Sequence, residues 1–485
     1  MTNSYKLFRP LALYTPALTA ILLVAGCSLI PTYERPAAPV ATQWPGAIST
    51  TNSENKSAQP FQAMDWKAFY ADATLQELVT AALANNRDLR VAVLNIEQAR
   101  AQLGVRRAAQ FPAVNAALTG SRTPDGNGGF SNSYAAGLAV TSYEFDFFGR
   151  VASLKDQALA QYLASEEASQ TVRISLMASV AQGWLNLLAD EELLGVSRET
   201  VGTREDSLKL MDLKLQYGAA SELDQRLAQS LLESARGTLA QQQRQRAQDE
   251  NALVLLLGQP LPESAQKQLA GTTLASMHLA DVPAGLPSEL LTRRPDIRQA
   301  EQLLIASNAN IGAARAAFFP NITLTAAFGS GSSELSGLFK SGSWGWTAAP
   351  QLLLPIFDAG RNQSNLEAAK AGRDIAVAQY EKAIQSAFRE VADALAGRDT
   401  LTRQLAASQG LLQAESERTR LTKLRFDAGA ASQLDWLDAQ RSLFIAQQTL
   451  VQTQLAYLQN QIALYKSLGG GARGTEPAGQ AVSAQ

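Results

Sequence analysis

The stretch that decides the fold is Asn86-Arg-Asp-Leu-Arg90, which leads through an Ala- and Gln-rich run to Arg107-Ala-Ala-Gln-Phe-Pro112. The chain repeats it as Arg294-Pro-Asp-Ile-Arg298 followed by Arg315-Ala-Ala-Phe-Phe-Pro320, so Asp88 and Asp296 stand 208 positions apart. A repeat of this length, present twice, indicates a duplicated architecture rather than a solenoid of short units.

Further along the chain the offset between the two copies becomes 211 and stays there. Gly149-Arg150 matches Gly360-Arg361, and Leu257-Gly258 matches Leu468-Gly469. The sequence therefore predicts a first repeat over residues 74–258, a linker over 259–287, a second repeat over 288–469 and a tail over 470–485.

Composition excludes several classes of protein. The 485 residues carry a net charge of -2, so there is no basic footprint for nucleic acid. One Cys and one His exclude a disulfide framework and argue against a His/Cys metal site. No nucleophile–base pair, phosphate loop or metal cluster is visible, so we expect neither an enzyme nor a bound cofactor. Abundant Ala, Gln and Leu with only 7% aromatic residues favour long helices.

The first residues have the pattern of an export signal. Lys6 and Arg9 precede an apolar run from Leu11 to Ala25, which is short for a membrane span but typical of a signal peptide. Small residues before the single Cys27 resemble a bacterial lipoprotein box. We therefore predict a lipoprotein signal peptide over 1–26 and lipidation of Cys27, an anchor rather than a span; the alternative is an ordinary signal peptide with an incidental Cys. Ser28 follows where Asp would suggest retention at the inner membrane, which implies the outer membrane.

Residues 27–73 are expected to form an extended arm. Several prolines forbid a helix there, and the segment from Ser49 to Gln59 is polar. The aromatic residues of this arm are predicted to hold it against the body of the protein: Trp44, Trp66, Phe69 and Tyr70.

Each repeat shows the same order of elements. A helix (74–109 in the first repeat) ends at a Phe-Pro pair, and alternating apolar and polar residues then predict a β-hairpin, over 113–145 and 321–354. Two long helices follow, 151–217 and 361–428, each about 100 Å at 1.5 Å per residue. Returning helices occupy 222–257 and 432–468. The half-length helices are expected to stack end to end beside the long ones, with the linker forming a belt at mid-length.

The turn between each long helix and its returning helix has a clear signature. Gly218 and Gly429 stand where a left-handed residue usually ends a helix. Ser221 and Ser432 then begin the next helix, with Asp224 and Asp435 three residues on, a capping box with Asp in place of Glu. The chain is expected to make two tight helical hairpins, whose ends we call the tips.

The four predicted strands have the length of outer-membrane strands. Four strands cannot close, and an open edge in lipid leaves unpaired backbone groups, so closure requires several copies: two give eight strands and three give twelve. Trp344 and Trp346 would serve as interfacial aromatic residues. The alternative is a four-stranded patch on a helical protein that does not enter a membrane.

The whole mature chain resembles the TolC-like outer-membrane factors, in particular their lipoprotein (NodT/OprM-like) branch. The resemblance is carried by Cys27-Ser-Leu-Ile-Pro31, Asn251-Ala-Leu-Val-Leu-Leu-Leu-Gly258, Leu291-Thr-Arg-Arg-Pro-Asp296 and Ile311-Gly-Ala-Ala-Arg-Ala-Ala-Phe-Phe-Pro320. It implies a mainly α fold in a homotrimer, with a trimeric α-barrel in the periplasm and a 12-stranded β-barrel in the outer membrane. It also implies a periplasmic adaptor protein and an inner-membrane transporter of the resistance–nodulation–division (RND) type as partners, and an exit duct for antibiotics, dyes and other toxic compounds.

The resemblance also suggests roles for the tip residues. The second hairpin would carry the periplasmic gate at Leu434, Asp435 and Asp438, with Leu223 and Asp224 as counterparts and Arg425 as a tether to a neighbouring acid. An apolar ring blocks a pore by dewetting and an acidic ring repels anions; simple helix capping is the alternative role for Asp224 and Asp435. Gly218, Ser221, Gly429 and Ser432 would form the adaptor-docking grooves, although Ala219 and Ala430 replace the Val usual in the family.

Two other functions stay open at this stage. A duct for secreted proteins or polypeptides would have the same architecture. A structural periplasmic coiled-coil protein would need no pore at all.

Overall fold

The structure is a computed structural model that describes residues 28–41, 44, 64–124, 126, 128–269, 271–283, 291 and 293–471. The predicted signal peptide (1–26), Cys27 and nearly all of the predicted tail lie outside these residues. The described residues are mainly helical with four antiparallel strands, which confirms the predicted fold class. They divide into two compact units, one with residues 95–165 and 299–381 and the other with residues 166–298 and 382–471 among its members.

The single helix predicted over 74–109 is wrong, because Asn86 interrupts it. α3 (Ala73–Asn85) ends there, and α4 (Arg87–Ala108) begins directly after it. Asn86 has extended backbone angles (φ -62°, ψ 131°), and its Oδ1 accepts a hydrogen bond from the N–H of Leu89 at 2.9 Å. Asn is among the best residues for this capping role, and its signal was present in the sequence.

The second polar group of Asn86 joins two helix ends. Its Nδ2 donates to the carbonyl of Leu256 at 2.9 Å, close to the end of α6 (Glu222–Leu257). Gly258 follows in the left-handed region (φ 67°) and lies so close to the backbone of Asn85 that a Cβ would collide with it. The end of α6 therefore meets the junction of α3 and α4, and Asn86 satisfies a carbonyl that a helix end leaves unpaired.

The second repeat makes the same junction with a different residue. Arg294, 208 positions after Asn86, donates from Nη1 to the carbonyl of Ser467 at 2.9 Å, and Ser467 is 211 positions after Leu256. Arg294 is buried and also binds Asp296, at 3.0 and 2.6 Å, and Glu390 at 2.8 Å. A neutral amide and a charged guanidinium thus occupy one structural position in the two repeats.

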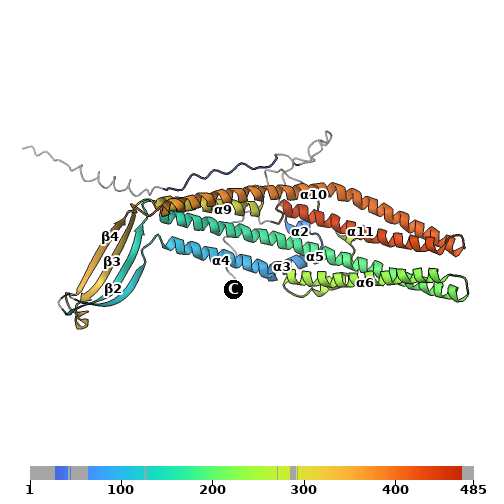
Figure 1. Cartoon of the computed structure of the whole chain (residues 1–485), viewed down its shortest axis with the longest axis horizontal. Coiled ribbons are helices and arrows are strands. Elements are labelled where there is room, and N and C mark those ends of the chain that lie inside the picture. The colour runs from blue at the N-terminus through green and yellow to red at the C-terminus, as the bar shows by residue number, and fades with distance from the viewer. Residues whose placement is uncertain are drawn as a thin grey trace, which may run out of the picture. The chain divides into compact units, whose positions relative to one another are not determined.

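One unit contains the sheet, formed by β1 (Val114–Pro124), β2 (Phe130–Phe145), β3 (Asn321–Ser332) and β4 (Trp344–Leu353). The strands pair antiparallel in the order β1-β2-β3-β4, and Figure 1 shows β2, β3 and β4 side by side. The two repeats meet where β2 pairs β3, and β1 and β4 are the edges. Gly137 and Gly329 face each other in this central pair at a close backbone approach that excludes a Cβ.

The same unit holds the ends of helices that lead to and from the strands. α9 (Pro295–Ala316) runs into β3, and α5 (Arg150–Gln216) and α10 (Arg361–Asp427) start after β2 and β4. The stacked rings of Phe148 and Phe319, with centroids 4.7 Å apart, join the start of α5 to the end of α9.

The extended arm lies along α9 in this unit. Asn308 donates to the carbonyl of Pro31 at 2.7 Å, and Arg315 donates to that of Leu29 at 3.1 Å. The arm and the helix thus run in opposite directions, and side chains of the helix satisfy backbone groups that an extended segment cannot pair by itself.

A buried carboxylate nearer the start of α9 also holds the arm against this helix. Glu301 accepts two hydrogen bonds from Arg35, at 2.7 and 2.9 Å, and one from the hydroxyl of Tyr33 at 3.0 Å. The two parallel hydrogen bonds of such an Arg–carboxylate pair fix the relative orientation of the two side chains as well as pairing their charges.

The other unit contains the two helical hairpins and the mid-length segments. α5 turns into α6, and α10 turns into α11 (Gln433–Ser467), as Figure 1 shows for each hairpin. Short elements lie beside them: α2 (Trp66–Phe69), α7 (Glu263–Leu269) and η2 (Leu274–Ser276).

Aromatic residues hold the arm in this unit, as the sequence predicts. Phe69 is fully buried and stacks on Tyr465 with ring centroids 4.0 Å apart, and Trp44 stacks on Phe388 at 4.9 Å. Tyr70 forms an isolated antiparallel bridge with Leu279, which brings the arm and the linker together.

Within the part of the chain that the structure describes, no helix combines the length and the apolar character that crossing a membrane requires.

The junction at Asn86 generates the first prediction. Asn86→Ala leaves the Leu89 N–H and the Leu256 carbonyl without their side-chain partners, which we expect to cost about 1–3 kcal/mol locally. Hydrogen exchange at the Leu89 amide should become about ten-fold faster or more. Gln98→Ala, an exposed position on α4, is the control and should leave that rate unchanged. Wild-type exchange in Asn86→Ala would show that packing alone holds the junction.

Candidate functional site

Both tips end their long helix in the predicted way. Gly218 and Gly429 have the same left-handed φ of 71°, which confirms the expected helix stop. At the second tip the N–H of Gly429 bonds to the carbonyl of Phe426 at 3.0 Å, and that of Ala430 bonds to Arg425 at 2.7 Å. The first tip has the same two bonds from Gly218 and Ala219. This pattern is a Schellman motif, and it satisfies the last carbonyls of each long helix.

The predicted capping boxes are also present. The N–H of Asp435 donates to Ser432 Oγ at 3.1 Å, while the N–H and the hydroxyl of Ser432 donate to Asp435 Oδ2 at 3.0 and 2.7 Å. Ser221 and Asp224 make the same set at 3.2, 3.1 and 2.6 Å. Asp224 and Asp435 therefore cap the returning helices within a single chain.

These bonds stabilise the charged form of the capping acids. The hydroxyl of Ser432, and then its backbone N–H, hold the pKa of Asp435 below its usual value, and Ser221 does the same for Asp224. Asp435 is exposed at its tip, and Asp224 is partly exposed.

The remaining predicted gate residues fall into two groups. Leu223 and Leu434 are exposed, at 78% and 63%, and occupy the same position of the two returning helices. Asp438 is instead held within the chain, where its carboxylate binds Arg418 of α10 at 3.2 Å and Arg441 of α11 at 2.7 Å. This carboxylate therefore ties α11 to α10 at the second tip.

Arg425 forms no salt bridge among the described residues, although its positive charge helps to lower the pKa of Asp435. Its Nη2 donates to the carbonyl of Ala430 at 3.2 Å, across the turn of the second tip.

Residues that the sequence did not single out also shape the tips. Lys214 of α5 lies over the ring of Phe426 of α10 at 4.6 Å, and Lys423 lies over the ring of Trp436 at 5.8 Å. Arg204 is buried and donates to Gln440 at 3.0 Å. Cross-helix pairs of this kind carry no local signal, because their members are far apart in the sequence.

The two tips share their backbone geometry and differ in charge. Asp438 corresponds to Leu227 and Arg418 to Ser207, both 211 positions earlier. The pair between Asp438 and Arg418 therefore has no counterpart at these positions of the first repeat, where Arg236 of α6 binds Glu205 of α5 at 2.9 Å instead.

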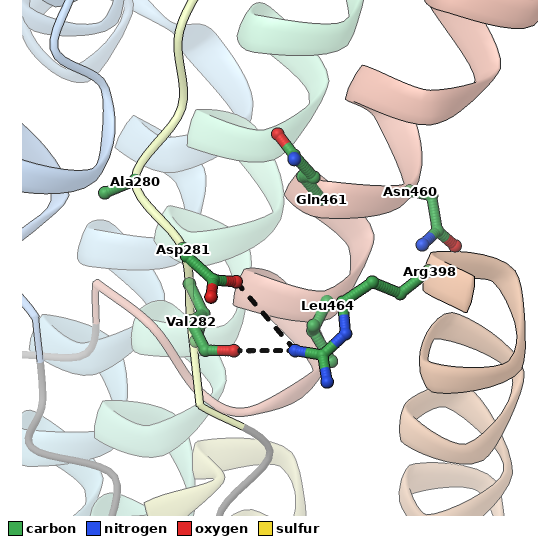
Figure 2. A pocket seen from close by; sticks show the side chains of 7 residues that line it. All are labelled: Ala280, Asp281, Val282, Arg398, Asn460, Gln461 and Leu464. Carbon is green, nitrogen blue, oxygen red and sulfur yellow. Dashed lines mark hydrogen bonds and ion pairs between the residues drawn. The ribbon is translucent and has the colours of Figure 1, made fainter. Parts of the chain in front are cut away.

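The cavity in Figure 2 is too small to be a substrate site. It is lined by the linker and by α10 and α11, has a volume of about 10 Å³, and is closed on one side by Arg398, which donates to the carbonyl of Val282 at 3.3 Å. A space of this size holds one water molecule at most.

Comparison with known proteins identifies the architecture. The family model described as "Outer membrane efflux protein" matches residues 78–259 and 286–470, which are the two sequence repeats. The chain is 47% identical over 469 residues to the probable efflux pump outer membrane protein TtgC of Pseudomonas putida, covering 95% of this chain and 96% of that one. It is 46% identical over 465 residues to the outer membrane protein OprJ of Pseudomonas aeruginosa, covering 94% and 95%.

A solved structure shows the same fold. The crystal structure of the open state of the MtrE outer membrane channel of Neisseria gonorrhoeae matches with a TM-score of 0.82 at 40% identity, over 92% of this chain and 99% of that one.

The left-handed conformation of Gly429 at the second tip predicts the direction in which an Ala substitution changes stability. Gly429→Ala is expected to destabilise the tip by about 1–2 kcal/mol, because φ is 71°, and Gly429→Val by more. Gly410→Ala, inside α10 and with open space around it, is expected to stabilise by about 0.5–1 kcal/mol. Thermal unfolding of the purified assembly measures both, and equal shifts for Gly429→Ala and Gly410→Ala would contradict the role of Gly429.

The capping acids generate a prediction of pH dependence. Their folded pKa values lie below the unfolded value of about 3.9, so their contribution is complete above that pH and is lost as the pH falls through the lower folded value. Hydrogen-exchange protection factors of the tip amides should stay level down to about pH 4.5 and fall below about pH 4. Asp435→Asn should abolish the acid-dependent loss of protection at the second tip. The loss at the first tip should stay as in the wild type. An unchanged acid response in this variant would refute the assignment.

Proposed function

Because the chain belongs to the outer membrane efflux protein family, we propose that it is the exit duct of a tripartite efflux pump. The observation that carries this proposal is the match of the family model to both repeats, each of which includes a complete capped tip. The protein belongs to the outer membrane and extends into the periplasm, like the channels it resembles. We assign it no catalytic step and no cofactor.

The proposed substrates are small toxic compounds. Relatives are named for the efflux of antibiotics, toluene and solvents. We propose that the same classes of compound, and dyes, pass through a lumen that copies of this chain form together. We propose that selectivity lies in the pump that loads the duct.

The proposed assembly is a homotrimer with a lipid anchor. Three copies bring twelve strands and remove every edge of the sheet, and lipidation of Cys27 would add an anchor in the outer-membrane lipid. The partners are a periplasmic adaptor protein and an inner-membrane transporter of the RND type. The exposed Gly218, Ser221, Gly429 and Ser432 are the proposed docking positions for the adaptor.

The proposed gate is the second hairpin. Leu434, Asp435 and Asp438 would form rings where three such hairpins converge, with Leu223 and Asp224 on the outer hairpins. Arg425, which donates to the carbonyl of Ala430 in the single chain, would tether the closed state by pairing with a neighbouring acid. The tie from Asp438 to Arg418 has no counterpart at these positions of the first repeat and holds α11 against α10. Breaking it would let the inner hairpin move without disturbing the capped turns.

Single-channel conductance tests the duct and the gate together. Asp438→Ala removes the tie to Arg418 and Arg441, so we expect conductance in planar bilayers to rise at least about two-fold, since conduction follows the width and charge of the narrowest ring. Glu222→Ala, which breaks a surface pair with Arg226 at the first tip, is the matched control and should not change conductance.

Three outcomes separate the alternatives. Unchanged conductance in Asp438→Ala would remove this residue from the gate and leave the duct. A wild-type assembly that conducts no ions would contradict the duct and favour a structural coiled-coil protein. Conduction without any rise in dye accumulation when the gene is deleted would favour a duct for secreted polypeptides.

A further inference from the structure

A buried carboxyl pair joins α5 to α6 in the first hairpin. Asp190 of α5 is 6% exposed, and its Oδ2 receives no hydrogen bond from any of the described residues. The carboxyl group of Asp249 on α6 lies within hydrogen-bonding reach of Asp190. Two ionised carboxylates offer each other no donor, and their charges repel. The contact is therefore complete only when a proton lies between the two groups.

The cation next to this pair is shared with other carboxylates. Arg246 of α6 donates to Glu191 at 2.7 Å and to Glu250 at 3.0 Å. The charged groups that act on Asp190 are Asp249 and Arg246 from α6 and, on α5 itself, its neighbour Glu191. Two of these three groups are negative, so the surroundings of Asp190 favour its neutral form.

The acidity of Asp190 agrees with this geometry. Burial, together with the hydrogen bond and the charge of Asp249, raises the pKa of Asp190 to about 7, and Arg246 opposes the increase. In an unfolded chain an Asp loses its proton near about pH 3.9. The folded pair thus keeps a proton through the acidic range and releases it near neutral pH.

The second hairpin has neutral residues at the equivalent positions. Asp249 corresponds to Asn460 and Asp190 to Leu401, both 211 positions later. The Nδ2 of Asn460 donates to the carbonyl of Ala394 on α10 at 2.9 Å. An amide thus makes a hydrogen bond between two helices with its own protons, whereas the carboxyl pair of the first hairpin needs one from solution.

The pair lies where α6 has little apolar contact. Leu253 and Leu257 are fully buried at the end of this helix, and the next buried residue toward the tip is Ala235. None of residues 236–252 is buried. Polar contacts such as the one between Asp190 and Asp249 therefore decide how firmly this part of α6 lies on α5.

We propose that Asp190 and Asp249 form a proton-operated clamp between α5 and α6. A proton from solution forms an O–H bond on the pair, removes one of its two negative charges and supplies the hydrogen bond between the helices. Loss of the proton to water leaves two repelling carboxylates and loosens α6 over residues 236–252. The clamp would respond to the pH of the periplasm, into which the protein extends.

The direction of the pH dependence follows from the two pKa values of Asp190. The folded value, about 7, lies above the unfolded value, about 3.9. The contribution of the clamp is therefore fully present below about pH 4 and is lost as the pH rises through about 7. This direction is opposite to that of the capping acids at the tips.

Hydrogen exchange of the purified full assembly tests the clamp. Protection factors, corrected for the pH dependence of the chemical exchange rate, are compared for the amides of residues 245–252. In the wild type they should fall about ten-fold between about pH 5 and pH 6 and be level above about pH 8, because opening of the folded pair releases one proton. Asp249→Asn supplies a permanent donor, as Asn460 does in the second hairpin, and should keep them level throughout.

The matched control on the same hairpin is Asp206→Asn, because Asp206 is exposed and pairs with Lys209 of its own helix. It should keep the wild-type pH response. An independent readout is the infrared C=O band of a protonated carboxyl, which the wild type should lose as the pH rises through about 7 and which Asp190→Asn should lack.

Three results would overturn the clamp: wild-type protection that does not change with pH, the same fall in Asp249→Asn, or no such titrating band. The band keeps the test decisive if Asp249→Asn fails to assemble, because it needs only the wild type and Asp190→Asn. None of these readouts involves conductance, so the clamp and the proposed duct can fail independently.

Discussion

Backbone hydrogen bonding at the two edges of the four-stranded sheet is the constraint from which the rest of the structure follows. β1 and β4 each present a row of N–H and C=O groups that one chain cannot pair, and leaving them unpaired in lipid would cost several kcal/mol per group. The duplicated sequence pairs the two repeats through β2 and β3 and leaves β1 and β4 as the edges of the described sheet. The helices also differ in burial. In the single chain α4 buries little beyond Leu103, whereas its counterpart α9 has buried residues along its length.

Local signals allowed much of the fold to be predicted. Gly218 and Gly429, the Ser-x-x-Asp capping boxes and the Phe-Pro ends of the half helices all act within a few residues, and the structure has the turns and strands they indicate. The break at Asn86 had a local signal too, but the apolar periodicity continues across it and outweighed that signal. The second bond of Asn86 could not be predicted locally, because its partner Leu256 lies 170 residues away.

The charged interactions of the candidate site were harder to predict for the same reason. Asp435 is recognisable from Ser432, three residues before it, whereas the partner of Asp438 on α10 depends on how two helices face each other. The equivalence of Asn86 and Arg294 shows a similar limit: one position keeps its geometry while its chemistry changes from an amide to a guanidinium. The same side chains hold both tips, whereas different side chains hold the equivalent helix junctions of the two repeats.

The arm that Glu301, Asn308 and Arg315 hold along α9 occurs once per chain, although the helix beneath it occurs twice. A ring of three chains would have six nearly equivalent helical ridges, but only three of them would be covered by an arm. A protein that wraps around the proposed homotrimer and contacts these helices would meet two kinds of surface. A wrapping partner that distinguishes them would bind in threes, whereas one that touches only the capped tips, which are alike in backbone, could bind in sixes.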